Sequence, residues 1–308
     1  MITKLVALLQ TAPLVSVNQE RISMTLQNLP ADAQAFLAPA KLNLMLHITG
    51  RRYDGYHLLE TVFTFIGLYD TVYLRSRDDG EIVLHTLIEG VDAEQDLSVR
   101  AARALQQASG AVLGADVWVE KNIPMGGGLG GGSSDAATVL LALNHLWQTD
   151  FSREQLMDLG LKLGADVPVF IFGQNSFASG IGEVLTEVSI PNQWYVVIKP
   201  NVHVATPKIF AHERLTRDSA PSIIRVFPRV QPLRNDMQAV VCEEYPEVAN
   251  ALAELNQFGH ALMTGSGACV FLACETEAAA REVYAQVATE YEAYCVAGLD
   301  QHPLYTLK

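Results

Sequence analysis

The sequence predicts a mixed fold of strands and helices, and three observations support this prediction. Every second residue from Leu42 to Ile48 is apolar, which is the period of a β-strand. Residues 139–147 carry apolar side chains at helical spacing. The chain has 308 residues, of which 49% are hydrophobic, so it can form two modest domains or one large one around an ample core.

The composition limits the partners of the protein. A net charge of −13 makes non-specific binding of nucleic acid or anionic membranes unfavourable, and no apolar run reaches the length of a membrane span. The four cysteines (Cys242, Cys269, Cys274 and Cys295) lack metal-ligand spacing. They are expected to be buried free thiols of a reducing compartment, which favours a cytoplasmic location. Residues 1–35 lack a convincing signal sequence and are predicted to form a peripheral or disordered N-terminal tail.

The other elements follow from local periodicity and from turn residues. Strands are expected at residues 40–49, 59–68, 71–74, 82–85, 194–198, 270–273 and 294–297, with two short ones in 177–187. Helices are expected at residues 98–107, 153–163, 246–256 and 276–289, and another begins with Thr206 as its N-cap. Asp78-Asp79-Gly80 is interpreted as a hairpin turn.

Residues 124–135 read Pro-Met-Gly-Gly-Gly-Leu-Gly-Gly-Gly-Ser-Ser-Asp, with six glycines in seven positions. A short strand (117–123) precedes them and a helix follows, so the glycines join a strand to a helix N-terminus. Unpaired backbone N–H groups and the positive end of the helix dipole lie there, and glycine lets a bulky anion approach the backbone. We therefore predict a phosphate-binding loop. A flexible linker is the alternative, but it would carry Ser, Pro and charge instead of glycines between apolar elements.

Several known phosphate loops do not match this stretch. Gly126-x-Gly128-x-x-Gly131 formally fits the dinucleotide fingerprint, but the residues after the helix are again helical in pattern. A Walker A loop needs Lys where Ser133 stands, and the protein-kinase sequences His-Arg-Asp and Asp-Phe-Gly do not occur. The stretch closely resembles the ATP loop of the GHMP kinases, a family of small-molecule kinases that includes galactose, homoserine, mevalonate and phosphomevalonate kinases.

This resemblance implies which residues bind ATP. They are Pro124, Met125, Gly126, Gly127, Gly128, Leu129, Gly130, Gly131, Gly132, Ser133 and Ser134, with backbone N–H groups and hydroxyls on the β- and γ-phosphates. Lys121, just before the loop, would cover a purine or face solvent. Asp135 would repel phosphate from the first helical turn. A divalent cation would relieve this conflict, so Mg²⁺ is expected together with ATP, although the sequence does not identify its ligands.

Two further GHMP-like motifs flank the loop in family order. Residues 39–44 (Pro-Ala-Lys-Leu-Asn-Leu) resemble the first motif, although a solvated strand face would also place Lys41 and Asn43 together. Residues 264–269 (Thr-Gly-Ser-Gly-Ala-Cys) resemble the third, a loop that packs beside the phosphate loop; a plain β-hairpin turn is the alternative. The motifs imply an α+β fold of two domains, the GHMP kinase fold. Its active site would lie in the cleft between an ATP-binding domain (36–189) and a C-terminal domain (190–308).

Residues 52–57 (Arg-Tyr-Asp-Gly-Tyr-His) resemble a signature of one branch of this family, whose acceptor is a cytidine diphosphate-linked methylerythritol. Cytosine would need aromatic stacking and hydrogen bonds at its edge. The implied substrate-binding residues are Asn43, Tyr56, His57, Thr206, Phe210, Gly265 and Ser266. Ordinary core packing is the alternative for Tyr56 and Phe210.

The implied catalytic residues are Lys41 and Asp166. Asp166 lies in Gly-Ala-Asp-Val-Pro (164–168), a motif of the same branch, although an Asp in such a setting is commonly a turn or cap residue. Asp166 would orient the acceptor hydroxyl and take its proton late, while Lys41 would favour the carboxylate and stabilise the transferring phosphoryl. Asp96 departs from the family, which commonly has Asn there, and a carboxylate lacks the donor of an amide.

The implied function is ATP-dependent phosphorylation of the 2-hydroxyl of this acceptor, giving the 2-phosphate and ADP in the methylerythritol phosphate route to isoprenoid precursors. The expected partner is this small molecule, with no nucleic acid and no membrane, and the chain is expected to be a monomer or a weak homodimer. Two alternatives stay open. One is another GHMP kinase, of the homoserine or mevalonate type, against which the signature at 52–57 argues. The other is a non-catalytic nucleotide-binding sensor on the same fold, against which the presence of both Lys41 and Asp166 argues.

Overall fold

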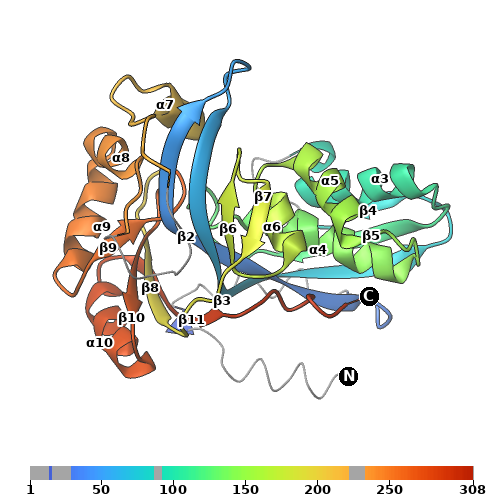
Figure 1. Ribbon diagram of the computed structural model, residues 1–308. Coiled ribbons are helices and arrows are strands. Elements are labelled where there is room, and N and C mark those ends of the chain that lie inside the picture. The colour runs from blue at the N-terminus through green and yellow to red at the C-terminus, as the bar shows by residue number, and fades with distance from the viewer. Residues whose placement is uncertain (1–13, 16–28, 87–91, 222–232, 308) are drawn as a thin grey trace.

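The computed structural model describes residues 14–15, 29–86, 92–221 and 233–307 (Figure 1). Within these residues the strands form one 11-stranded sheet with the main order β4-β5-β3-β11-β8-β10-β9. These strands are β4 (Ile82–Leu84), β5 (Gly114–Glu120), β3 (His57–Arg77), β11 (Glu292–Leu299), β8 (Trp194–Lys199), β10 (Val270–Cys274) and β9 (Ala261–Met263). Off this path, β2 (Gln34–Arg51) and β6 (Ser176–Ser179) pair with β3, β7 (Val184–Glu187) pairs with β6, and β1 (Leu14–Val15) pairs with β11.

The helices form two groups, one on each side of the long β2–β3 pair (Figure 1). The first group is α3 (Leu97–Ser109), α4 (Gly131–Leu146), α5 (Arg153–Leu163) and α6 (Val167–Phe172), preceded by the 3₁₀ helix η2 (Ala93–Gln95). The second group is α8 (Gln238–Glu244), α9 (Pro246–Asn256) and α10 (Glu277–Val287), while α7 (Thr206–Ala211) lies near the turn that joins β2 to β3. The α+β fold is therefore confirmed. The predicted boundaries of its two domains stay a prediction.

The strand β2 differs from the expected half-buried strand. Its residues from Ala38 to His47 are buried on both faces, and Lys41 is only 2% exposed. Leu42 and Leu44 pack into a core shared with β3 and β11, as the alternation predicted. A register shift between Asn43 and Met45 then interrupts the alternation, so Met45 joins this core while Leu46 and Ile48 pack into the core of the C-terminal half. The opposite face is covered by the loop at residues 264–269, from which the Thr264 hydroxyl accepts a hydrogen bond of the Asn43 backbone N–H at 2.9 Å. A polar strand face in the interior must have internal partners, and these partners belong to the functional site.

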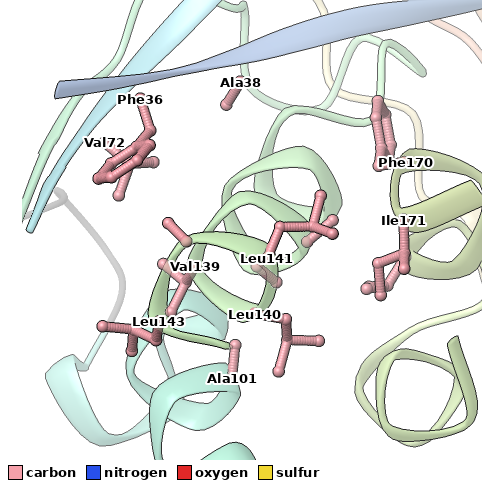
Figure 2. Packing of buried hydrophobic residues seen from close by; sticks show 14 of the residues in the cluster. Phe36, Ala38, Val72, Ala101, Val139, Leu140, Leu141, Leu143, Phe170 and Ile171 are labelled. Carbon is pink, nitrogen blue, oxygen red and sulfur yellow. The ribbon is translucent and has the colours of Figure 1, made fainter. Parts of the chain in front are cut away.

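The helix that follows the glycine-rich stretch is anchored in the first core. Val139, Leu140 and Leu143 of α4 are fully buried, as the helical spacing predicted, and they lie close to Ala101 of α3 and to α6 (Figure 2). Replacing one such buried leucine by alanine typically costs about 2–5 kcal/mol. Since the glycine-rich loop leads directly into α4, this packing fixes the position of the loop relative to the sheet.

The second core lies under the helices of the C-terminal half. Helices α5 and α9 have the predicted bounds. Helix α10 is one residue shorter at its start and two residues shorter at its end than predicted. The β10–β9 and β10–β8 pairs are antiparallel, and their apolar residues pack against α8, α9 and α10. This half therefore presents the loop between β9 and β10 from a rigid base.

Some predicted details are wrong. Residues 59–68 and 71–74 belong to one continuous strand, β3. Asp78-Asp79-Gly80 is not a hairpin turn, because β4 pairs in parallel with β5 and not with β3. Thr206 is the first residue of α7, and Ala205 is its N-cap.

The predicted N-terminal tail is described only in part. Leu14 and Val15 form β1, which pairs with Cys295 and Tyr294, and β2 already begins at Gln34, so these parts of residues 1–35 join the sheet. Residues 1–13 and 16–28 lie outside the described residues. The four cysteines are free, as predicted, although Cys242 is only partly buried. In the described parts of the chain, no helix has the length and apolar character needed to cross a membrane.

Candidate active site

The glycine-rich stretch connects β5 to α4, as predicted, and its backbone requires glycine. Gly126, Gly128 and Gly130 have φ of 70°, 75° and 77°, in the left-handed region. A Cβ on Gly128 would lie 2.4 Å from the carbonyl oxygen of Thr264, so the neighbouring chain also excludes a side chain. The helix begins at Gly131, and the first N–H of α4 bonded to its own turn is that of Ser134, which donates to Gly130 at 2.8 Å. The preceding N–H groups are therefore available to an anion in the adjoining hollow of about 390 Å³.

The loop between β9 and β10 braces the glycine-rich loop. The backbone N–H of Cys269 donates to the carbonyl of Gly127 at 3.1 Å, and that of Ala268 donates to Gly126 at 3.3 Å. Asn235 Nδ2 in turn donates to the carbonyl of Gly265 at 2.7 Å. Both interpretations of residues 264–269 are thus correct, because this loop is a hairpin connection and it also packs beside the glycine-rich loop.

Lys41 lies where three parts of the chain meet. Its Nζ donates to Asn43 Oδ1 at 2.7 Å and to the carbonyl of Gly128 at 3.0 Å, and it lies 3.2 Å from Asp166 Oδ2. The ammonium is also 5.4 Å from the centre of the Phe63 ring. These contacts account for three N–H donors of a nearly buried cation. Lys41 is therefore held in one position, next to both the loop and the carboxylate.

Asp166 is the N-cap of α6, but its side chain makes no capping hydrogen bond. Its carboxylate instead pairs with Lys41 and remains 40% exposed in a cleft of about 880 Å³. A carboxylate that was only a cap would bond the first turn of its helix. The structure thus brings Lys41 and Asp166 into contact, and it leaves the carboxylate accessible to a second molecule.

Asn43 supports Lys41. Its Oδ1 accepts from the lysine and its Nδ2 donates to the Thr61 hydroxyl at 2.8 Å. Asn43 lines the cleft, yet it is only 3% exposed. Its predicted contact with the acceptor hydroxyls stays a prediction.

Lys121 forms a largely buried cluster below the glycine-rich loop. It also lines the hollow at the loop, so its predicted contact with a purine stays a prediction. Its Nζ contacts Asp135 Oδ2 at 2.6 Å and also pairs with Asp70 Oδ2. Asp70 Oδ1 accepts the backbone N–H groups of Asn122 and Ile123 at 2.6 and 2.8 Å. Burial and the neighbouring Asp70 raise the pKa of Asp135 well above its ordinary value. The carboxylates of Asp135 and Asp70 raise the pKa of Lys121 against the opposing effect of burial.

The structure bears on two expectations for this region. Asp135 was expected to repel phosphate, and its contact with Lys121, which is shared with Asp70, offsets part of its charge; the expected Mg²⁺ stays a prediction. Ser134 was expected to hold phosphate, but its hydroxyl is buried and donates to the carbonyl of Pro39 at 2.7 Å. Ser133, by contrast, lines both the hollow at the loop and the larger cleft.

The far end of the cleft carries the aromatic residues. The rings of His57 and Phe210 stack with centroids 4.8 Å apart and an interplanar angle of 24°. Arg217 Nε donates to His57 Nε2 at 3.2 Å, and burial together with Arg217 and Arg51 lowers the pKa of His57. His57 is therefore neutral, with its proton on Nδ1. Tyr56 is 62% exposed, which excludes core packing for this residue, whereas Phe210 lines the cleft and also packs on the second core.

The remaining predicted residues line the same cleft or its rim. Gly265 borders the cleft next to Gly128, and the hydroxyls of Thr206 and Ser266 lie 2.6 Å apart. Asp96 caps α3 by accepting the Ser98 backbone N–H at 2.8 Å, a role that needs only an acceptor. Sequence reasoning missed Asp70, Thr61, His203 and Arg217, because each lies outside the recognised motifs. Thr264 lies inside the motif at residues 264–269, but its hydrogen bond with Asn43 was not predicted.

The fold and this site define the class of the protein. Residues 96–174 match the family model of the GHMP kinases N terminal domain, and residues 225–293 match that of the GHMP kinases C terminal. The chain belongs to the GHMP kinase family.

The similar proteins within this family share one name. The chain is 59% identical over 280 residues to the 4-diphosphocytidyl-2-C-methyl-D-erythritol kinase of Neisseria meningitidis serogroup C (strain 053442), which covers 91% of this chain and 100% of the relative. It is 54% identical to the kinase of the same name from Chromobacterium violaceum, over 88% of this chain and 96% of the relative. A crystal structure of 4-(cytidine 5'-diphospho)-2C-methyl-D-erythritol kinase matches with 32% identity and a TM-score of 0.75, over 86% of this chain and 99% of that one.

Proposed function

We propose that this protein transfers the γ-phosphoryl group of ATP to the 2-hydroxyl of 4-diphosphocytidyl-2-C-methyl-D-erythritol, giving the 2-phosphate and ADP in the methylerythritol phosphate route to isoprenoid precursors. The observation that carries the proposal is the contact between Lys41 and Asp166, at 3.2 Å, in a cleft that reaches the glycine-rich loop. The names of its relatives at 54–59% identity support the choice of acceptor.

Asp166 acts on the acceptor hydroxyl. An alcohol is far less acidic than a carboxylic acid, so full deprotonation before transfer is unfavourable. Asp166 Oδ1, the oxygen not paired with Lys41, accepts the hydroxyl hydrogen, orients the oxygen towards the γ-phosphorus and takes the proton as the new bond forms. Phosphoryl transfer depends mainly on such positioning and on charge stabilisation.

Lys41 and the loop supply the charge stabilisation. The Lys41 ammonium is held at the carbonyl of Gly128, so it lies at the boundary of the two hollows, where the phosphoryl group passes between donor and acceptor. The backbone N–H groups of residues 131–133 and the hydroxyl of Ser133 hold the phosphates of ATP.

Mg²⁺ accompanies ATP in this proposal. In the described ranges of the chain, no cluster of three or more acidic, histidine or cysteine side chains is arranged for a metal ion. A Mg²⁺ site commonly uses one or two protein oxygens and is completed by phosphate oxygens and water. The cation would therefore be held mainly by ATP and would neutralise part of its phosphate charge.

The aromatic end of the cleft binds the cytosine ring. Tyr56 and Phe210 provide stacking faces, and the neutral His57 offers its Nδ1–H to the acceptor atoms on the cytosine edge. Arg217 fixes this tautomer because its donation to Nε2 requires an unprotonated nitrogen there.

The test measures ADP release by the purified protein with Mg-ATP and one of three acceptors: 4-diphosphocytidyl-2-C-methyl-D-erythritol, homoserine or mevalonate. Release with the cytidyl compound alone is the expected result. Release only with homoserine or mevalonate would keep the family but contradict the acceptor. ATP binding without release with any acceptor would favour the non-catalytic sensor. A cytoplasmic location and a monomeric or weakly dimeric state remain predictions.

A further inference from the structure

His203 lies beside Gly126, which lines both hollows. A Cβ on Gly126 would lie 2.8 Å from His203 Nδ1, so the imidazole edge directly borders the first glycine of the loop. His203 is exposed and lines the larger cleft. Among the residues that the structure describes, no hydrogen bond or ion pair engages its side chain. An unpaired donor at a ligand cleft is available to a ligand.

Three of the other cationic groups near the cleft are already engaged, and the fourth, Arg51, lines the cleft at its far end from the glycine-rich loop. Lys41 pairs with Asp166, and Lys121 lies between two carboxylates. The Arg217 guanidinium donates to His57 and to three backbone carbonyls, those of Phe210, His212 and Leu215. Arg51, at the turn between β2 and β3, is exposed and donates to the carbonyl of Gly55 at 3.1 Å. The cleft must nevertheless accept an anionic second substrate in a chain of net charge −13.

Residues 203–210 form one wall of the cleft, which extends from the glycine-rich loop to the aromatic end. His203 borders Gly126, Thr206 bonds Ser266 at 2.6 Å, and Phe210 stacks on His57. In the proposed acceptor, the diphosphate separates the cytidine from the polyol that carries the reacting hydroxyl. If the cytosine lies at Phe210 and the hydroxyl at Asp166, the diphosphate faces the part of the wall that begins with His203.

We propose that His203 is a specificity-determining residue that binds the diphosphate of the acceptor. This proposal rests on the proposed function, because it assumes a cytidine diphosphate-linked acceptor in this cleft. The imidazole N–H donates a hydrogen bond to a phosphate oxygen of the acceptor. Its place beside Gly126 keeps the acceptor diphosphate apart from the phosphates of ATP, which occupy the other side of the loop.

The experiment compares two probes that differ only in the diphosphate. The dissociation constants of cytidine diphosphate and of cytidine are measured by titration calorimetry, with ADP saturating the donor site, for wild type and for His203→Leu, which removes the donor. The variant should weaken cytidine diphosphate about tenfold, as expected for the loss of a hydrogen bond to a charged group, and leave cytidine unchanged. In steady-state assays the KM of the acceptor should rise about as much, with kcat and the KM of ATP unchanged.

Three further variants make the result specific. His212→Leu is the matched control, because His212 lies at the end of α7 beside Glu244, outside the cleft, and this variant should bind both probes as wild type does. His203→Lys should recover most of the affinity for cytidine diphosphate, since it restores a cationic donor. Arg51→Gln tests the rival cation at the β2–β3 turn and should have the smaller effect. Thermal unfolding verifies that each variant is folded; His203 is exposed, so little change is expected.

Several results would overturn the proposal. One is equal binding of cytidine diphosphate by wild type and His203→Leu, and another is a rise in the KM of ATP instead of the acceptor. Loss of affinity in Arg51→Gln alone, or no recovery in His203→Lys, would do the same. A failure of the proposed function gives a different result, in which the wild-type protein itself neither binds cytidine diphosphate nor releases ADP with the acceptor.

Discussion

Two lysines flank the glycine-rich loop, and their carboxylate partners differ in their access to solvent. Lys41 pairs with one carboxylate, Asp166, whose side chain is 40% exposed in the cleft. Lys121 pairs with two carboxylates, Asp70 and Asp135, whose side chains are 0% and 4% exposed. Both lysines therefore have opposite charge within contact distance, but only one of the two groups leaves a carboxylate oxygen for another molecule.

This comparison distinguishes a catalytic role for the Lys41–Asp166 pair from a structural role for the Lys121 cluster. A buried ion pair pays a desolvation cost that its internal contacts must offset, and removing one partner leaves an uncompensated buried charge. Lys121 and Asp70 therefore hold the entry to the loop in place. A reacting acid or base must touch the substrate, which the exposed Asp166 can do. A perturbed pKa below the loop is thus a sign of burial, whereas the proposed base is recognised by geometry.

The largest expected effect is on the exposed carboxylate. Asp166→Asn should lower kcat by roughly 10²–10⁴-fold, the usual contribution of a general base, because an amide cannot take the hydroxyl proton. The unfolding midpoint should fall as well, because the amide leaves the nearly buried Lys41 without its carboxylate partner. Steady-state kinetics checks this, with Asp158→Asn on the exposed face of α5 as the control. Near wild-type turnover would remove Asp166 from the chemistry.

The next effect concerns the cation beside it. Lys41→Met should lower kcat by about 10²–10³-fold, as expected for the loss of one group that stabilises transition-state charge. The KM values should change less than kcat, because the phosphoryl group carries its developing charge only during transfer. A rise in KM at constant kcat would reduce Lys41 to a binding residue.

Replacing the buried Lys121 should cost a free energy comparable to that expected for Lys41→Met, but the loss should be in stability instead of turnover. Lys121→Met leaves Asp70 and Asp135 without their cation, and breaking a buried pair in this way commonly costs about 3–5 kcal/mol of unfolding free energy. Urea unfolding measures this loss. At a temperature where the variant is folded, its kcat should fall much less than that of Asp166→Asn. Unchanged stability with lost turnover would reverse the two roles.

The smallest effect is expected for Asp135→Asn, because an amide has the size of a protonated carboxyl. The pKa of Asp135 is raised above its ordinary value of 3.8, so the folded state takes up a proton there. Its contribution to stability is fully present below that ordinary value and is lost as pH rises through the folded-state pKa. The wild type should therefore lose stability with rising pH relative to the asparagine variant. Parallel unfolding curves from pH 5 to 8 would show that Asp135 does not titrate in this range.

Much of this arrangement was predictable, because the key side chains belong to local motifs. Lys41, the glycine-rich loop and Asp166 were each placed by their neighbours in the sequence, and the structure brings them together. Position within an element was harder to predict. Ser133 and Ser134 are equivalent in the sequence, but consecutive helical residues point about 100° apart. One therefore lines the hollow and the other bonds Pro39.

The residues that were missed act across long distances in the chain. Arg217 carries no motif, and its partners are mostly backbone carbonyls, whose positions depend on the folded chain. Similarly, the alternation of β2 predicted a solvated face, because nothing local shows that the loop containing Thr264 covers it. Local pattern predicts which residues are unusual, and only the fold shows what each one contacts.

The hydrogen bonds from Ala268 and Cys269 to Gly126 and Gly127 make the glycine-rich loop depend on the C-terminal family region. The N-terminal family region contains the complete glycine sequence, but its backbone shape depends on residues that are synthesised much later. On a ribosome the loop would therefore remain unbraced until the strand β10 has emerged. A fragment ending before residue 260 would keep the glycine-rich sequence but lose the hydrogen bonds that fix its backbone, so the two family regions form one structural unit.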